Sequence, residues 1–474
     1  MSSYHCLDEL QQWLDSYLNF EKTPQKNIFW LDTMEFLCKK LGRPEHAAPA
    51  FHIAGSKGKG SVSAFISSIL DAAGYRVGLY TSPHIVAFVE RIGSAHGAFS
   101  EAVYQAASDE LMQAINGLKS DELPGGRRLT WFELVTLYAF LCFRRAQVDY
   151  GVYEVGLGGR LDSTNVLSPL ACCITPIELE HTEFLGNTLE AIAAEKGGII
   201  KPATPVFVAA QQPPVKAVFR RIAAVQNAPI LFIDEQNMST KLDYSSAFSD
   251  AHEAHDASGA FGMQLELRAP QFSRPLTARL RLLGEFQAQN AALAAVAVKS
   301  ALPSISEDAI ERGLSAAVLP GRFELVPPPR AYAGIRALVL DGAHTVHSVA
   351  GTLKTFRALF AERNAHLLFA CAADKDMAHI ARLFSGAASN GKSNHTKHAV
   401  TFTHLTLTKP GNAKQSNLAS LCRAFDDAGL HYAYNEDYVA AIRDALAAAA
   451  KANAVLLVTG SFYLLAEVKK LLAA

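Results

Sequence analysis

The sequence predicts an α/β protein of two domains, each built on a parallel sheet with helices on both faces. Strand-like and helix-like segments alternate along most of the 474 residues, which is the order that parallel sheets with helical crossovers require. Pro320-Gly321 and the run Pro327-Pro328-Pro329 interrupt this alternation, and a second one then starts. The predicted domains are therefore residues 1–320, a doubly wound domain, and the smaller 321–474.

The composition sets limits on the partners of the chain. Half of the residues are hydrophobic and 19% are charged, so large cores can form. Lys plus Arg (44) nearly balances Asp plus Glu (45), which provides no global field to attract nucleic acid or an anionic membrane. The N-terminus has no signal-peptide pattern, and charges break the most apolar helices well short of a membrane span. We expect a cytoplasmic protein with neither kind of partner.

The cysteines support the same cellular location. There are seven, scattered along the chain, without a CxxC pair, and several lie in apolar runs. This pattern predicts reduced core residues and not a disulfide or zinc framework.

The first α/β element has the features of a phosphate-binding loop. Residues 52–61 read His-Ile-Ala-Gly-Ser-Lys-Gly-Lys-Gly-Ser. Three glycines in six positions permit a tight turn that points several N–H groups at one anion, and Lys59 lies where an ammonium group could reach a phosphate. The candidate binding residues are Gly55, Ser56, Gly58, Lys59, Gly60 and Ser61. The alternative is a structural strand-to-helix turn.

The segments around this loop support the binding interpretation. Apolar residues recur after it at helical spacing, up to Gly74, and residues 76–80 are strand-like. The loop nevertheless has two residues, where the usual phosphate loop has four, between its first glycine and the Gly-Lys pair. Gly60 also stands where a Mg²⁺-binding hydroxyl is usual, so that hydroxyl must come from Ser61 or another loop.

Further elements follow in order along both domains. In the first domain we expect a helix over 130–145 and strands over 150–155, 170–174 and 205–209. Residues Glu235 to Gly262 show no clear helix or strand periodicity, and segments of alternating apolar and polar residues follow at 263–267 and 276–283. This pattern predicts an edge hairpin or small antiparallel sheet carrying a mobile loop. In the second domain we expect strands over 335–340, 366–371 and 454–458, helices over 347–360 and 377–383, and a terminal helix.

Three candidate side chains in the first domain lie at the ends of predicted elements. Glu154 ends a strand, at the edge where doubly wound folds place ligands, and is either a Mg²⁺ ligand or a solvated loop residue. His181, in a polar loop after the next strand, is either a metal ligand or merely exposed. Lys196 precedes Gly197-Gly198 and, taken alone, is a cation that complements the dipole at a helix C-terminus.

The second domain offers a comparable pair. Asp341 and His344 directly follow an apolar strand, separated by two small residues. They either face one substrate group together or form a simple strand-to-helix turn. Two α/β domains that meet across a cleft commonly hold a nucleotide and a second substrate.

Taken together, these segments resemble the folylpolyglutamate synthetase and dihydrofolate synthetase family, relatives of the Mur cell-wall ligases. The resemblance spans nearly the whole chain. Its motifs are the loop 55–61, Ser82-Pro-His84 with Glu90-Arg91, Thr130-Trp-Phe-Glu133, residues 154–166, His181-Thr-Glu-Phe-Leu-Gly, Glu195-Lys196, Gln287 with Asn290, Gly321-Arg322, Asp341-Gly-Ala-His344, Asp374-Lys-Asp376 and Thr459-Gly-Ser461.

The resemblance implies an ATP-dependent amide ligase that adds L-glutamate to a folate or to dihydropteroate through an acyl phosphate. The implied fold is a P-loop-type ATPase domain followed by a Rossmann-like glutamate ligase domain. By this resemblance Lys59 and the loop N–H groups hold the β and γ phosphates, and Ser82, Glu154 and His181 bind Mg²⁺. The protein is then expected to be a monomer that binds only small molecules.

The resemblance also assigns the remaining candidates. Asn290, Arg322 and Asp341 contact ATP, while Asp341, His344 and Ser461 position the glutamate or the acyl phosphate. Lys196 matches a lysine that is carbamylated in several relatives, where it becomes an anion beside the metals, which reverses its interpretation as a helix-end cation.

Some residues depart from the family pattern and keep other functions open. Ser56-Lys57 replaces the usual Thr-Asn, Glu180 replaces Asp, and Thr345 replaces Asn. These changes are the only support for a relative that binds ATP without ligating. A Mur-type ligase of cell-wall precursors is a further alternative, against which the N-terminal segment from Tyr17–Lys22 to Leu41-Gly42 weighs, because it resembles the folate family.

Overall fold

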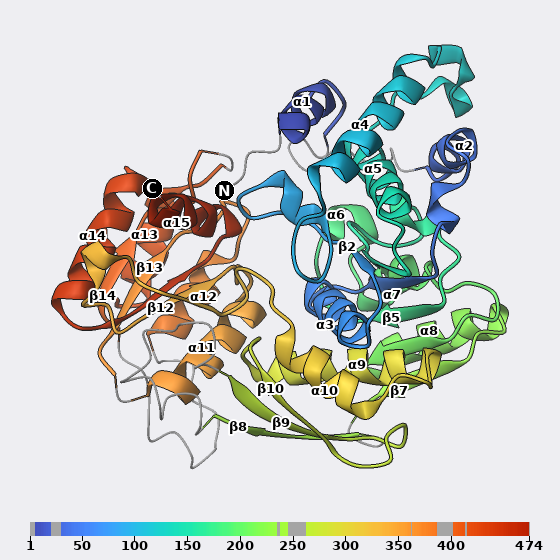
Figure 1. Cartoon of the computed structure of the whole chain (residues 1–474). Helices are drawn as coiled ribbons and strands as arrows, with labels where there is room; N and C mark the ends of the chain where they lie inside the picture. Colours follow the sequence, from blue (N-terminus) through green and yellow to red (C-terminus); the bar gives the residue numbers. More distant parts are fainter. Residues whose placement is uncertain are drawn as a thin grey trace. The chain divides into compact units, whose positions relative to one another are not determined.

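The computed structural model describes residues 5–19, 30–234, 238–244, 262–361, 363–385, 402–412 and 415–473. The chain divides into two compact units (Figure 1). The first comprises Met1–Lys241, Leu265–Ala278 and Ala288–Ala317, and the second Leu242–Gln264, Arg279–Gln287 and Val318–Ala474. The last break lies next to the boundary predicted at residue 320, whereas two short segments before it group with the second unit.

The first unit is built on a seven-stranded sheet in the order β3-β2-β4-β1-β5-β6-β7. Its strands are β1 (Ala50–Ala54), β2 (Val77–Tyr80), β3 (Ile92–Gly93), β4 (Tyr150–Glu154), β5 (Ala171–Ile174), β6 (Val206–Ala209) and β7 (Ile230–Ile233). All neighbours are parallel except β2 and β3. Because β1 lies between β4 and β5, the loops after these three strands emerge at the same edge of the sheet.

Helices connect and cover these strands. They are α1 (His5–Leu14), α2 (Asp32–Lys40), α3 (Lys59–Ala72), α4 (Glu101–Asn116), α5 (Trp131–Arg145), α6 (Thr182–Leu185), α7 (Leu189–Gly197), α8 (Pro213–Val225), α9 (Glu285–Ala301) and α10 (Glu307–Ala316). One apolar core joins α1, α2, α4 and α5 to the sheet, and another joins α7 and α8 to β5 and β6. Helix α3 packs against β1, β2 and β4, and α10 packs against α3.

A buried hydrogen-bond chain fixes the loop that follows β4. His52, fully buried in β1, lies with Nε2 2.8 Å from the Thr164 hydroxyl. That hydroxyl donates to Asp162 Oδ1 at 2.5 Å, so it accepts from His52 Nε2–H, and burial favours the neutral form of the ring. Asp162 Oδ2 in turn accepts from the backbone N–H groups of Gly156 and Leu157, both at 3.0 Å. This series of hydrogen bonds therefore runs from the centre of the sheet to the loop that directly follows Glu154.

A separate three-stranded sheet has the order β10-β9-β8, from β8 (Ser239–Asp243), β9 (Met263–Arg268) and β10 (Leu276–Leu280). This confirms the small additional sheet expected in this region. Most of the loop predicted before it, and residues 20–29 of the N-terminal segment, lie outside the described residues.

The second unit contains a six-stranded sheet in the order β11-β12-β16-β13-β14-β15. Its strands are β11 (Glu324–Val326), β12 (Ala337–Asp341), β13 (Ala365–Phe369), β14 (Phe402–Leu407), β15 (Ala433–Tyr434) and β16 (Val455–Thr459). Only β11 is antiparallel to its neighbour. Its helices are α11 (Val346–Phe360), α12 (Met377–Phe384), α13 (Leu418–Asp427), α14 (Tyr438–Lys451) and α15 (Phe462–Ala473).

The structure confirms the predicted fold class and the strands and helices predicted before and after residue 320. All seven cysteines are unpaired, and six of them are buried. Within the described ranges, no helix is both long and apolar enough to cross a membrane.

The contact between α3 and α10 leaves no room for a side chain at Gly313. A Cβ there would lie 2.3 Å from Ile69 Cα and 2.7 Å from the Ser68 carbonyl oxygen. Gly313→Ala should therefore lower the free energy of unfolding by about 1–3 kcal/mol, measured by urea denaturation. Gly351→Ala in α11 is the matched control, because the nearest atom there is 3.6 Å away. Equal effects of the two substitutions would contradict this account of the packing.

The buried His52 should make stability depend on pH. Burial and, to a smaller extent, the charge of Lys201 lower its pKa to about 3. Below about pH 6.5 the unfolded chain binds a proton that the folded protein does not, so stability falls as the pH drops toward 3.

His52→Gln keeps an N–H donor for Thr164 but does not titrate. Its stability should fall less than that of the wild type between pH 7 and pH 4.5, by about 2–3 kcal/mol in chemical denaturation. The same pH dependence in both proteins would show that His52 is not the neutral buried group described above.

Candidate active site

The loop between β1 and α3 has the shape of an anion-binding turn. Gly55 and Gly58 have φ angles of +140° and +90°, which favour glycine. A Cβ at Gly55 would lie 1.8 Å from Thr175 Oγ1, and one at Gly58 would lie 2.6 Å from Asn290 Oδ1. The chain continues directly into α3, whose first residue is Lys59, so the helix N-terminus opens onto this turn. The structure thus brings the predicted residue Asn290 to the loop.

The other predicted loop residues have distinct surroundings. The Ser56 N–H donates to the Pro176 carbonyl at 3.0 Å, and its hydroxyl donates to the Glu178 carbonyl at 3.2 Å. Gly60 and Ser61 lie buried in the first turn of α3. Ser56 therefore fixes the loop to the segment after β5, and Gly60 and Ser61 fix the start of the helix.

Two lysines converge on the carbonyl oxygen of Gly55. Lys59 Nζ donates to it at 3.2 Å and Lys196 Nζ at 2.8 Å. Lys196 also donates to Glu180 Oε1 at 3.1 Å, and Lys57 Nζ lies 3.4 Å from Glu180 Oε2. Lys57 and Lys196 therefore contact one carboxylate beside the turn, and Lys59 shares the Gly55 carbonyl with Lys196. These three residues are here called the lysine cluster.

Charge and burial determine the ionisation of this group. Burial alone raises the pKa of Glu180, but the charges of Lys59, Lys196 and Lys57 together lower it to about 2. Burial and the charge of Lys59 lower the pKa of Lys196 to about 8, although Glu180 acts in the opposite direction. Three cations around one carboxylate produce an excess of positive charge, which suits a phosphate group.

Lys196 lies in the last turn of α7, as the sequence predicted. Its side chain, however, is only 2% exposed and contacts Gly55 and Glu180. Lys196 therefore connects the end of α7 to the turn after β1 and to Glu180, in addition to complementing the helix dipole.

The predicted metal-binding residues follow three strands of the first sheet. Glu154 ends β4 and is buried, and its Oε2 accepts from the N–H of Ser82, which follows β2, at 3.1 Å. His181 lies exposed on the loop after β5, with a φ of +47°. The structure thus joins Ser82 to Glu154, whereas His181 follows β5, the strand that pairs with β1 on the side away from β4.

The donor set is compatible with magnesium. In the part of the chain that the structure describes, no three His, Cys, Asp or Glu side chains are grouped to hold a metal ion by themselves. Mg²⁺ does not need such a cage, because it usually takes one or two carboxylates together with waters and substrate phosphates. The Glu154 carboxylate and the Ser82 hydroxyl are of this kind, whereas a histidine nitrogen is less typical.

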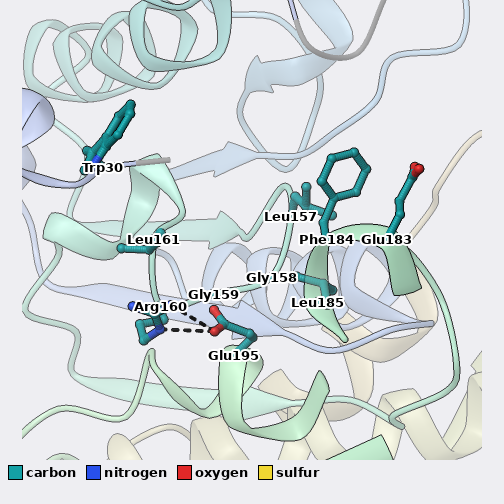
Figure 2. A pocket seen from close by; sticks show the side chains of 10 residues that line it. All are labelled: Trp30, Leu157, Gly158, Gly159, Arg160, Leu161, Glu183, Phe184, Leu185 and Glu195. Atoms are coloured by element: carbon teal, nitrogen blue, oxygen red, sulfur yellow. Dashed lines mark hydrogen bonds and ion pairs between the residues drawn. The ribbon is translucent and has the colours of Figure 1, made fainter. Parts of the chain in front are cut away.

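A pocket of about 240 Å³ adjoins the loop after β4 (Figure 2). Its lining is Trp30, Leu157, Gly158, Gly159, Arg160, Leu161, Glu183, Phe184, Leu185 and Glu195. Arg160 donates to Glu195 Oε1 at 2.9 and 3.2 Å, which the dashed lines in Figure 2 mark. The lining combines aromatic and aliphatic side chains with a few charged groups, as ligand pockets commonly do.

In the second unit, Asp341 organises the turn after β12. Its Oδ2 accepts from Phe323 N–H at 2.7 Å, and its Oδ1 accepts from Ala343 N–H at 2.8 Å and from the Thr352 hydroxyl at 2.9 Å. Burial raises its pKa, an effect that these donors and the charge of Arg322 oppose. The carboxylate thereby ties the Arg322 segment to the turn that carries His344.

His344 and Ser461 lie at the same edge of the second sheet. They follow β12 and β16, which are paired neighbours that end together at Asp341 and Thr459. His344 Nδ1 lies 2.8 Å from the Gly342 carbonyl and so carries a proton, which leaves Nε2 as the acceptor of the neutral ring. The Ser461 hydroxyl accepts from Tyr463 N–H at 3.1 Å.

Phe462 completes this edge of the second unit. The guanidinium carbon of Arg322 lies 4.3 Å from the centroid of its ring. A Cβ at Gly342 would lie only 2.2 Å from the ring, so glycine is required there.

Sequence reasoning missed several residues of these sites. Thr175, Phe462 and His52 act through contacts between distant segments, and Glu180 was noted only as a departure from a pattern. The available signal was the glycines at positions 55 and 342, where the structure leaves no room for a side chain. Thr345, the third departure, caps α11 by accepting from Ser348 N–H at 3.3 Å.

Comparison with known proteins places this geometry in a family. Residues 53–298 match the Mur ligase middle domain, and residues 321–462 match the glutamate ligase domain of Mur ligases. The dihydrofolate synthase/folylpolyglutamate synthase of Bacillus subtilis is 33% identical over 98% of this chain and 99% of its own length.

Solved structures agree over the full length. Mycobacterium tuberculosis folylpolyglutamate synthase complexed with ADP has a TM-score of 0.81 at 25% identity, over 99% of both chains. An Escherichia coli structure in complex with DHPP and ADP has a TM-score of 0.76 at 26% identity, over 98% of this chain and 97% of that one. The chain therefore belongs to the folylpolyglutamate synthase and dihydrofolate synthase family of ATP-dependent ligases, within the Mur ligase superfamily.

Proposed function

We propose that this ligase joins L-glutamate to a folate, to dihydropteroate, or to both, through an acyl phosphate. The observation that carries the proposal is the full-length relationship to an enzyme named for both activities. Its substrates are then small molecules, and its balanced charge supports the absence of nucleic-acid and membrane partners. We propose that it acts as a monomer in the cytoplasm.

The proposed reaction proceeds in two steps, phosphorylation of the carboxylate and formation of the amide. A carboxylate oxygen of the folate or pteroate attacks the γ-phosphorus of ATP, and ADP leaves. The amine nitrogen of glutamate then attacks the acyl carbon, the phosphate leaves, and the nitrogen loses a proton. Charge develops first on phosphoryl oxygens and then on the tetrahedral carbon, so preplaced cations and donors accelerate both steps.

The loop 55–61 is the proposed site of the phosphates. Lys59 and the N–H groups at the start of α3 hold the β and γ phosphates, and Asn290, which adjoins Gly58, contacts the nucleotide. Arg322 is the proposed ATP contact from the second unit. The ammonium groups of Lys57 and Lys59, which lie at the turn, support this assignment.

Ser82, Glu154 and His181 are the proposed ligands of Mg²⁺. The oxygens of Ser82 and Glu154 suit this ion, which when bound neutralises phosphate charge. We further propose that Lys196 is carbamylated, as the family resemblance implies. A pKa of about 8 supports this, because a larger fraction of its amine is neutral at physiological pH than in an exposed lysine.

The pocket lined by Trp30 and Phe184 is the proposed site of the aromatic rings of the folate or pteroate. Its apolar side chains offer surface on which flat rings bury area, and Arg160 and Glu195 offer polar groups at its margin.

Asp341, His344 and Ser461 are proposed to serve the glutamate and the acyl phosphate. Asp341 accepts three hydrogen bonds from its own chain, which supports a role in positioning Arg322 and His344. His344, with Nε2 as acceptor, suits an interaction with the incoming ammonium group, and Ser461 suits an interaction with an anionic oxygen.

An assay of phosphate release tests the function directly. With ATP, Mg²⁺ and L-glutamate, we expect turnover on adding dihydropteroate, a reduced folate, or either, and none when glutamate is omitted. Turnover only with a muramyl precursor would establish a Mur-type ligase instead. Nucleotide binding without turnover on any acceptor would identify a binding protein.

His344→Ala should separate the two halves of the reaction. We expect ligation to fall by about 100-fold or more, because the group that engages the amine is lost, while the nucleotide Kd stays unchanged. Lys59→Ala is the reciprocal variant, and it should lose nucleotide binding together with ligation. Calorimetric titration with a nonhydrolysable ATP analogue measures both Kd values. Loss of nucleotide binding in His344→Ala would contradict this division of roles.

A further inference from the structure

The segment that follows β5 connects the turn after β1 to a side chain that the proposed reaction does not use. Residues 175–178 are here called the bridging segment. Strand β5 lies between β1 and β6, and its backbone pairing with β6 ends at Ile174 and Val208. Beyond that point the backbone groups of the bridging segment bond to partners on both sides of it.

On one side, the bridging segment bonds to the turn. The Pro176 carbonyl accepts from Ser56 N–H at 3.0 Å, and the Glu178 N–H donates to the Ser56 hydroxyl at 3.0 Å. That hydroxyl in turn donates to the Glu178 carbonyl at 3.2 Å. Thr175 lies directly against Gly55, since a Cβ at Gly55 would be 1.8 Å from Thr175 Oγ1. The position of the turn therefore depends on that of the bridging segment.

On the other side, the bridging segment bonds to the side-chain amide of Gln211, which follows β6. Gln211 Nε2 donates to the Thr175 carbonyl at 3.0 Å, and its Oε1 accepts from the Ile177 N–H at 3.1 Å. These are the two bonds that the N–H and C=O of one residue on a parallel neighbouring strand would make. Ile177 is buried, so loss of the amide would leave its N–H short of a partner, which costs free energy.

We propose that Gln211 is a positioning residue of the ligase, which fixes the bridging segment and, through Ser56, holds the turn 55–61 in the shape that binds phosphate. The inference rests on the proposed function, because the phosphates are those of ATP. The bridging segment also leads directly to the loop that carries His181. Misplacement of such groups by about 1 Å can cost about 100-fold in rate, so a residue outside the site can control it.

Gln211→Met tests this role, because it nearly keeps the length of the side chain and removes both hydrogen bonds. We expect the Kd for AMPPCP, measured by calorimetry with excess Mg²⁺, to rise about five- to tenfold. The KM for L-glutamate should stay within about twofold of the wild type, because the residues proposed for glutamate belong to the second unit. A smaller folded fraction would instead lower kcat and leave both constants unchanged.

Two further variants control this experiment. Gln212→Met is the matched control, because Gln212 is the next residue, is exposed and makes no side-chain hydrogen bond at the start of α8. It should bind AMPPCP as the wild type does. Gln211→Asn keeps the amide but is one methylene shorter, so it should not reach both partners and should raise the Kd as Gln211→Met does. It takes the place of Gln211→Met if that variant does not fold.

A double-mutant cycle with Ser56→Ala tests the route of the effect. Ser56→Ala removes both hydroxyl bonds to Glu178 and so weakens the connection between the bridging segment and the turn. Gln211→Met should therefore raise the Kd by only about two- to threefold in the Ser56→Ala background.

The outcomes separate this inference from the proposed function. Equal AMPPCP Kd values for the wild type and the folded Gln211 variants would overturn the inference and leave the function standing. An effect of Gln211→Met that is equally large with and without the Ser56 hydroxyl would also overturn it. Absence of AMPPCP binding by the wild type would instead overturn the proposed function, and this inference with it.

Discussion

The ammonium groups of Lys57 and Lys59 lie beside the turn that joins β1 to α3, and the proposed binding of phosphate depends on their positive charge. An excess of positive charge next to a helix N-terminus is what a polyphosphate requires. Burial and the charge of Lys59 lower the pKa of Lys196 to about 8, and the charges of Lys59, Lys196 and Lys57 lower that of Glu180 to about 2. The pKa of each group therefore depends on the charges of its neighbours as well as on its own burial.

The fold creates this arrangement by bringing distant segments to one sheet edge. Because β1 lies between β4 and β5, Gly55, Glu154 and Glu180 follow neighbouring parallel strands. The close approach of Thr175 to Gly55 holds the turn, and the buried His52–Thr164–Asp162 chain holds the adjoining loop. The second unit also brings distant segments to one sheet edge, since Asp341 ends β12 and Ser461 follows the neighbouring strand β16.

The sequence predicted the fold class and most elements because strand and helix periods are strong in both alternations. It also predicted that Gly55, Lys59, Glu154 and Asp341 lie at strand ends, since that follows from order along the chain. The functions assigned to these residues remain predictions. The sequence could not reveal that Lys196 bonds to Gly55, 141 residues away, or that Glu180 serves two lysines. Such contacts depend on how strands are ordered in the sheet, which periodicity does not encode.

The measurement that tests the central claim most directly is a crystal structure with AMPPCP and Mg²⁺. The account predicts the β and γ phosphates on the turn 55–61, within hydrogen-bonding distance of Lys59 Nζ and of backbone N–H groups at the start of α3. A triphosphate bound away from this turn, with the lysine cluster unchanged, would contradict it.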